Sequence, residues 1–176
     1  EQYKAINELK RKLNDEYSIS FFGRLKRREV AEEIYKNRLQ PSDDGRPLAL
    51  IIYPKQDWNS SYEVNNQFSE LIGRGYKVMY YEAVTEDDVY RAVEVVGSKQ
   101  QIQAFILGGH GNQTTISLGL DDPDKFSPEN ESYFLDPEDI SEIIQKGLSK
   151  YIKLDASIIL ESCSTGQGGK VAKNMA

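Results

Sequence analysis

The chain contains one cysteine and one histidine, and each follows a short apolar run. Cys163 follows the run 156–160 and stands within Glu-Ser-Cys-Ser-Thr-Gly at residues 161–166. His110 follows the run 104–107 and has a glycine on each side. A cysteine paired with a histidine can attack a carbonyl carbon and form a covalent intermediate. We therefore take Cys163 as the candidate nucleophile and His110 as the candidate proton acceptor.

The residues around this pair favour chemistry over an ordinary core role. A lone cysteine is more often an inert buried hydrophobe than a nucleophile, and a lone histidine is usually a core residue. Here Ser162 and Ser164 leave room around the thiol, and a helix predicted just downstream would favour the thiolate. Gly111 lets a backbone N–H approach a substrate closely. The N–H groups of Gly111 and Cys163 are therefore the predicted oxyanion donors.

The elements that must position this pair form an alternating pattern of strands and helices. The predicted strands cover 48–53, 76–82, 104–107 and 156–160, with a short extra strand at 115–118, and the predicted helices cover 62–73, 86–97 and 136–148. This alternation predicts an α/β fold with a parallel sheet covered by helices. Right-handed crossovers would bring the carboxyl ends of the strands to one edge, where such sheets build their sites. The 53 positions between His110 and Cys163 leave room for a crossover helix between neighbouring strands.

The chain divides by composition into two parts. Residues 1–42 carry helical spacing and are predicted to form an N-terminal helical segment. A polar linker at 42–47 precedes the predicted catalytic domain, which covers residues 46–176. The sequence stops at Ala176 within a helical pattern and shows no signal for a helix end. We therefore expect this domain to be incomplete at its C-terminus.

Composition limits the classes of protein that the chain can belong to. Its 176 residues suit one α/β domain with an appendage, and 39% hydrophobic with 28% charged residues is typical of soluble globular proteins. A net charge of −6 argues against a nucleic-acid partner. The single cysteine excludes an internal disulfide and fits a reducing compartment, so a cytoplasmic location is expected. No apolar run approaches the roughly 20 residues of a membrane span, and no signal peptide is visible.

The two motifs together resemble those of the caspase-like cysteine peptidases, which include caspases, metacaspases, separases, legumains and gingipains. A caspase carries Gln-Ala-Cys, then one residue and Gly, with its histidine about 50 residues upstream. The hexapeptide 161–166 is closest to metacaspases, where an acidic residue stands two before the cysteine. The resemblance covers residues 46–176. It implies a caspase-like, mostly parallel sheet and a cysteine endopeptidase that forms an acyl-enzyme, acts on a protein or peptide, and needs no cofactor or metal.

The resemblance also implies how the substrate is chosen. In this group, the residue two before the nucleophile helps to line the pocket for the side chain that precedes the scissile bond. Glu161 at this position predicts a basic side chain, Arg or Lys, because a partly desolvated carboxylate binds one well. Asp57, in the loop after the first strand, occupies a region that also contributes to this pocket. Family members continue into further strands, so a C-terminal segment or a partner chain is expected to complete the sheet.

Three other interpretations remain open at this point. The main alternative is a catalytically silent caspase-like module with a regulatory or scaffolding role. A phosphate-binding loop at 108–111 is a second alternative, although the chain lacks G-x-G-x-x-G and a P-loop. The acidic loop within 120–133 suggests calcium dependence, but it lacks the glycine-containing spacing of an EF-hand loop. We therefore interpret this loop as solvated.

Overall fold

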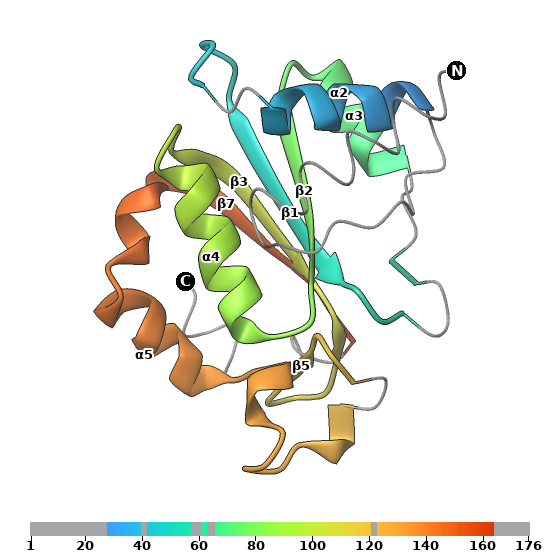
Figure 1. The fold of residues 1–176 in the computed structure, drawn as a ribbon, viewed down its shortest axis with the longest axis vertical. Helices are drawn as coiled ribbons and strands as arrows, with labels where there is room; N and C mark the ends of the chain where they lie inside the picture. The colour runs from blue at the N-terminus through green and yellow to red at the C-terminus, as the bar shows by residue number, and fades with distance from the viewer. Residues whose placement is uncertain (1–27, 40–41, 58–60, 63–65, 121–122, 164–176) are drawn as a thin grey trace.

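The computed structural model describes residues 28–39, 42–57, 61–62, 66–120 and 123–163 (Figure 1). The helices are α2 (Arg28–Leu39), α3 (Asn66–Gly73), α4 (Glu86–Gly97) and α5 (Pro137–Gln145). The main sheet comprises β1 (Leu48–Pro54), β2 (Lys77–Ala83), β3 (Ile102–Gly108) and β7 (Ile152–Glu161). A small sheet comprises β4 (His110–Gly111), β5 (Ile116–Ser117) and β6 (Phe134–Leu135). Short 3₁₀ turns cover Pro123–Lys125, Glu131–Tyr133 and Leu148–Tyr151.

The main sheet is parallel and has the strand order β2-β1-β3-β7. Ile52 of β1 pairs with Leu107 of β3, and Leu107 pairs in turn with Leu160 of β7. Because all four strands run the same way, their carboxyl ends lie at one edge of the sheet. The predicted parallel sheet flanked by helices is confirmed.

Helices cover both faces of the sheet and form two apolar cores (Figure 1). On one face, α2 and α3 contribute Ile34, Tyr35 and Phe68 to a core shared with β1 and β2. On the other face, α4 contributes Val89 and Val93 to a core shared with the same strands and β3. Every residue of β1 and β2 is buried, which is why β1 is a continuous apolar run rather than an alternating one, whereas β2 also buries Lys77 and Glu82.

Local hydrogen bonds set where the helices begin and end. The Asp88 carboxylate accepts the backbone N–H groups of Val84 and Thr85, at 2.9 and 3.1 Å, which supports the predicted start of α4. Helix α5 ends at Gln145 rather than near 148, because Gly147 adopts a left-handed conformation with φ of 66°. Helix α3 begins at Asn66 rather than at 62, and residue 62 lies instead in a turn.

Strand β7 is longer and more exposed than the sequence predicts. It spans Ile152–Glu161 rather than 156–160, and it is the outermost strand on its side of the described sheet. Leu154 is fully exposed, and Ile158 and Ile159 are 37% and 45% exposed. The run 156–160 was expected to be buried on both faces, and its place at the sheet edge explains the difference.

The predicted N-terminal helical segment is described only from residue 28. Helix α2 lies before the predicted boundary at residue 42, yet it packs on the sheet through Val30, Ile34 and Tyr35. Arg46 connects the linker to this helix through an ion pair of 2.8 Å with Glu33. The helix expected around 6–17, and the one expected after Cys163, fall outside the described residues. Within the described ranges, no helix has the length and apolar character needed to cross a membrane.

Candidate active site at the ends of β3 and β7

The ends of β3 and β7 bring the two candidate catalytic residues to the same level of the sheet. Gly108 and Glu161 are register partners, and the Gly109 N–H donates to the Glu161 carbonyl at 3.2 Å. His110 and Cys163 each stand two residues beyond this pair. The chain segments that follow are also in contact, because a Cβ added to Gly111 would lie 1.9 Å from the hydroxyl oxygen of Ser162.

The two residues differ in how far solvent reaches them. Cys163 is exposed, so its thiol is accessible to a substrate or a reagent. His110 is buried, and 11% of its side chain is exposed. Its backbone belongs to β4, which pairs antiparallel with β5 through His110 and Ser117. The sequence places His110 just past the end of a core strand, and the structure adds that its backbone forms a short hairpin with β5.

The hairpin also determines where the Gly111 N–H points. The Asn112 N–H donates to the Thr115 carbonyl at 3.1 Å, which makes these two a hydrogen-bonded pair. Pairs alternate along an antiparallel ladder, so Gly111 and Ile116 form a pair whose N–H groups point away from each other's strand. The Gly111 N–H is therefore directed away from β5, as an oxyanion donor requires.

Asp57 lies against His110. Its Oδ1 atom is 3.3 Å from His110 Nε2, and its side chain is fully buried. The same carboxylate accepts the backbone N–H groups of Ser61 and Tyr62, at 3.1 and 2.8 Å. The pocket-lining role that the resemblance gives to Asp57 stays a prediction. Its carboxylate contacts the histidine and the backbone of its own loop.

Glu161 has both carboxylate oxygens engaged. The Tyr53 hydroxyl donates to Oε2 at 2.6 Å, and Gln67 Nε2 donates to Oε1 at 2.8 Å. Burial, and then the hydrogen bond to Glu161, raise the pKa of Tyr53 well above its ordinary value, so its hydroxyl stays a donor. These bonds from β1 and α3 fix the orientation of a half-buried carboxylate at the end of β7.

Tyr62 is a site residue that the sequence did not reveal. Its hydroxyl donates to the Gly109 carbonyl at 2.6 Å and lies 2.9 Å from the Glu161 carbonyl. Its ring packs edge-on against His110, with ring centroids 5.4 Å apart. The sequence placed this residue at the start of a helix, and nothing in its neighbours distinguished it. In the structure it lies in a turn, where its backbone N–H donates to the Asp57 carboxylate.

Gly108 makes room for the two tyrosines. A Cβ at this position would lie 2.6 Å from the ring of Tyr53 and 2.7 Å from the ring of Tyr62. Both distances are too short for any side chain, so the rings occupy the space above the glycine. Tyr53 can therefore reach across β3 to Glu161. The paired glycines before His110 were the sequence signal for this close approach.

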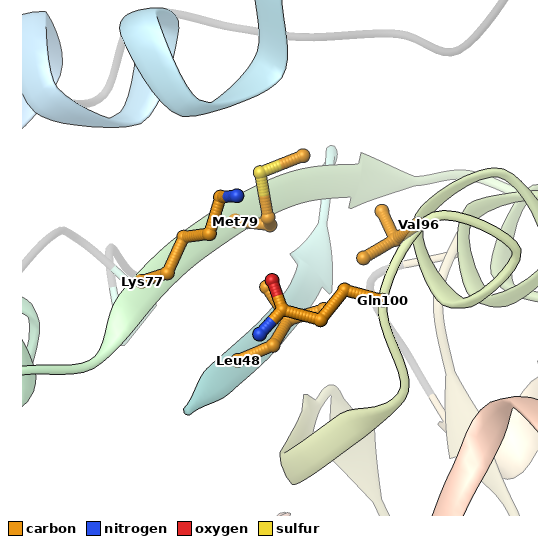
Figure 2. A pocket seen from close by; sticks show the side chains of 5 residues that line it. All are labelled: Leu48, Lys77, Met79, Val96 and Gln100. Atoms are coloured by element: carbon orange, nitrogen blue, oxygen red, sulfur yellow. The ribbon is translucent and has the colours of Figure 1, made fainter. Parts of the chain in front are cut away.

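A small hollow elsewhere in the fold is separate from this site. It lies at the amino-terminal ends of β1 and β2, the opposite end of the sheet, and has no room for a water-sized molecule (Figure 2). Its lining residues are Leu48, Lys77, Met79, Val96 and Gln100. Lys77 donates to the Ser42 carbonyl and lies 3.8 Å from the Asp44 carboxylate, so its charge is compensated. In the described part of the chain, no three acidic, His or Cys side chains are grouped to hold a metal ion.

Comparison with known proteins gave no match to a family model and no significant match to a curated sequence. The resemblance to caspase-like peptidases therefore depends on the two sequence motifs alone.

Proposed function

We propose that the chain is a caspase-like cysteine endopeptidase that cleaves after basic residues. The observation that carries this proposal is the pairing of Gly108 with Glu161, which sets His110 and Cys163 equally far beyond two adjacent parallel strands. Contact between the following segments, at Gly111 and Ser162, supports their approach. An exposed thiol and a buried imidazole that follow neighbouring strands are suited to nucleophilic catalysis.

The reaction follows from the roles of these groups. His110 takes the thiol proton, and the sulfur of Cys163 attacks the scissile carbonyl carbon. The N–H groups of Gly111 and Cys163 stabilise the resulting oxyanion. The protonated imidazole then gives its proton to the leaving amine, and a thioester remains on Cys163. Water, deprotonated by His110, hydrolyses the thioester, which releases the acid and restores the thiol.

Asp57 supports the histidine in this scheme. Its carboxylate faces Nε2 of the imidazole at 3.3 Å and so favours the tautomer that carries its proton on that nitrogen. Nδ1 would then be the nitrogen that accepts the thiol proton. The backbone N–H groups of Ser61 and Tyr62 hold the carboxylate in place. Asp57 is in this way a positioning residue for His110.

Glu161 supplies the preference for a basic side chain. Its carboxylate lies just before the nucleophile in sequence, and Tyr53 and Gln67 fix its orientation. An Arg or Lys side chain preceding the scissile bond would form a charge-assisted hydrogen bond with it, whereas an Asp side chain would meet like charge.

Selective labelling and peptide hydrolysis test this function together. Because the chain has a single cysteine, iodoacetamide modification reports on Cys163 alone. We expect fast labelling that slows in His110→Ala, and hydrolysis of Arg or Lys peptides that Cys163→Ala abolishes without changing thermal unfolding. Absence of hydrolysis, together with labelling that does not depend on His110, would favour the silent regulatory module instead.

A further inference from the structure

Tyr62 contacts each part of the candidate site although it lies on none of the strands that carry it. It stands in the turn between β1 and α3. Its hydroxyl reaches both the Gly109 and the Glu161 carbonyls, at 2.6 and 2.9 Å. The Gly109 N–H also donates to the Glu161 carbonyl. The hydroxyl therefore bonds where the chain continues from β3 toward His110 and from β7 toward Cys163.

Two further contacts connect the same residue to the histidine. The backbone N–H of Tyr62 donates to Asp57 Oδ2 at 2.8 Å, and Asp57 Oδ1 faces His110 Nε2. The ring of Tyr62 packs edge-on against the imidazole at an interplanar angle of 77°. Tyr62 thus touches the imidazole through its ring, the carboxylate that faces the imidazole through its backbone N–H, and the strand end that leads to the thiol through its hydroxyl.

The hydroxyl of Tyr62 remains a donor at neutral pH. Burial is the main cause that raises its pKa to about 12, and the nearby Cys163, Asp57 and Glu161 contribute in the same direction.

We propose that Tyr62 is a positioning residue that fixes the separation of His110 and Cys163 by holding the ends of β3 and β7 together. This inference rests on the proposed cysteine–histidine chemistry. Proton transfer and attack need reacting atoms within about 3–3.5 Å, and a displacement of about 1 Å can lower the rate about 100-fold. Loss of the hydroxyl would let the two strand ends move relative to each other while both catalytic side chains remain present.

Tyr62→Phe tests this role because it keeps the ring and removes only the hydroxyl. Tyr80→Phe is the matched control, since Tyr80 lies in the same core and its buried hydroxyl donates to Glu82 at 2.9 Å, away from the site. We expect Tyr62→Phe to lower kcat on an Arg peptide by about 10- to 100-fold and to change KM by less than about twofold. Tyr80→Phe should keep the wild-type kcat even if its Tm falls as much as that of Tyr62→Phe. A kcat of Tyr62→Phe within about twofold of wild type would overturn the proposal.

A second measurement decides the positioning role without relying on peptide hydrolysis. His110 is the only histidine, so its imidazole NMR signals are identified without assignment. Tyr62→Phe should shift or split these signals, whereas Tyr80→Phe should leave them at their wild-type positions. If the wild type cleaves no peptide, the proposed function fails, and the NMR result alone then supports or overturns the positioning role. Unchanged His110 signals in Tyr62→Phe would overturn it.

Discussion

The Tyr53 hydroxyl and the Glu161 carboxylate form a 2.6 Å hydrogen bond across an intervening strand. Tyr53 belongs to β1 and Glu161 to β7, and β3 lies between them. The bond is possible because Gly108 of β3 has no side chain at the level where the tyrosine ring crosses. Gln67 joins the same pair, since its side-chain amide contacts both the tyrosine and the carboxylate. The proposed specificity carboxylate is thus fixed by elements that do not carry the nucleophile.

Substitution of Glu161 should separate substrate recognition from nucleophilic reactivity. We expect Glu161→Gln to lower kcat/KM for Arg or Lys peptides about 100-fold, or roughly 3 kcal/mol, because the basic side chain loses its partner charge. The rate of Cys163 labelling by iodoacetamide should stay near the wild-type value. The comparison needs a fluorogenic peptide panel and a thiol-labelling time course. A wild-type preference for Asp, or indifference to charge, would show that the pocket assignment is wrong even if the catalytic pair is right.

Addition of a single methyl group at Gly108 should disrupt the packing of the two tyrosines that contact the site. In Gly108→Ala, the new Cβ would collide with the rings of Tyr53 and Tyr62, which must then move. Overpacking of this kind costs about 1–3 kcal/mol, measurable as a lower midpoint in urea unfolding. Peptide hydrolysis should fall more than the stability loss explains, because both tyrosines contact the site.

Gly73→Ala provides the matched control for this substitution. Gly73 is the last residue of α3, and a Cβ added there has nothing within 4 Å. This variant should keep wild-type activity and equal or exceed wild-type stability. If Gly108→Ala behaves like Gly73→Ala, the close packing of the two tyrosines above Gly108 does not support the site.

Glu86 should make the stability of the fold depend on pH. Burial, and then its hydrogen bond and charge interaction with Asp139, raise the pKa of Glu86 from 4.5 to about 8. Asp139 also accepts a hydrogen bond from Tyr90, and the charges of Glu142 and Asp87 act in the same direction. The folded state therefore binds a proton more tightly than the unfolded chain. Its free energy of unfolding should fall as pH rises from about 4.5 to about 8.

Glu86→Gln should remove this dependence. The variant carries no titrating group at position 86, so its Tm should exceed that of the wild type at pH 8, and the difference should shrink toward pH 5. Glu70→Gln is a suitable control, because Glu70 pairs with the exposed Arg74 one turn along α3. Equal Tm values for wild type and Glu86→Gln from pH 5 to 8 would show that Glu86 does not cause the pH dependence of stability.

The sequence predicted the framework of the fold because that framework depends on local patterns. Apolar runs and helical spacing identified the strands of the main sheet and the helices that cover it. The alternation of strands and helices predicted that the strands run parallel. The motif spacing also identified adjacent strand ends as the place where His110 and Cys163 stand. These features can be predicted from short segments of sequence together with the rule that crossovers between parallel strands are right-handed.

The contacts that refine the site were not predictable in the same way. Tyr53, Tyr62 and Gln67 lie between 94 and 108 positions from Glu161, and no local pattern reports such contacts. The exposure of β7 depends on its place at the edge of the sheet, which its composition does not show. The turn at residue 62 includes a hydrogen bond from its backbone to an aspartate side chain, which no local pattern predicts.

The exposed edge of β7 should be a site of association. Leu154, Ile158 and Ile159 present apolar side chains on a strand whose outer edge has no partner among the described residues. Such an edge pairs readily with another strand, so we expect that a further strand, from the same gene product or a partner chain, normally covers it.

The 176-residue chain alone should self-associate at micromolar concentration in light scattering. Ile159→Lys should reduce this association, because a charged side chain on an edge strand opposes pairing. Leu39→Lys, which changes an equally apolar residue with 38% exposure on α2, should have no such effect. A wild-type chain that is monodisperse, monomeric and active would refute the prediction, since its β7 edge would then be stable without a partner.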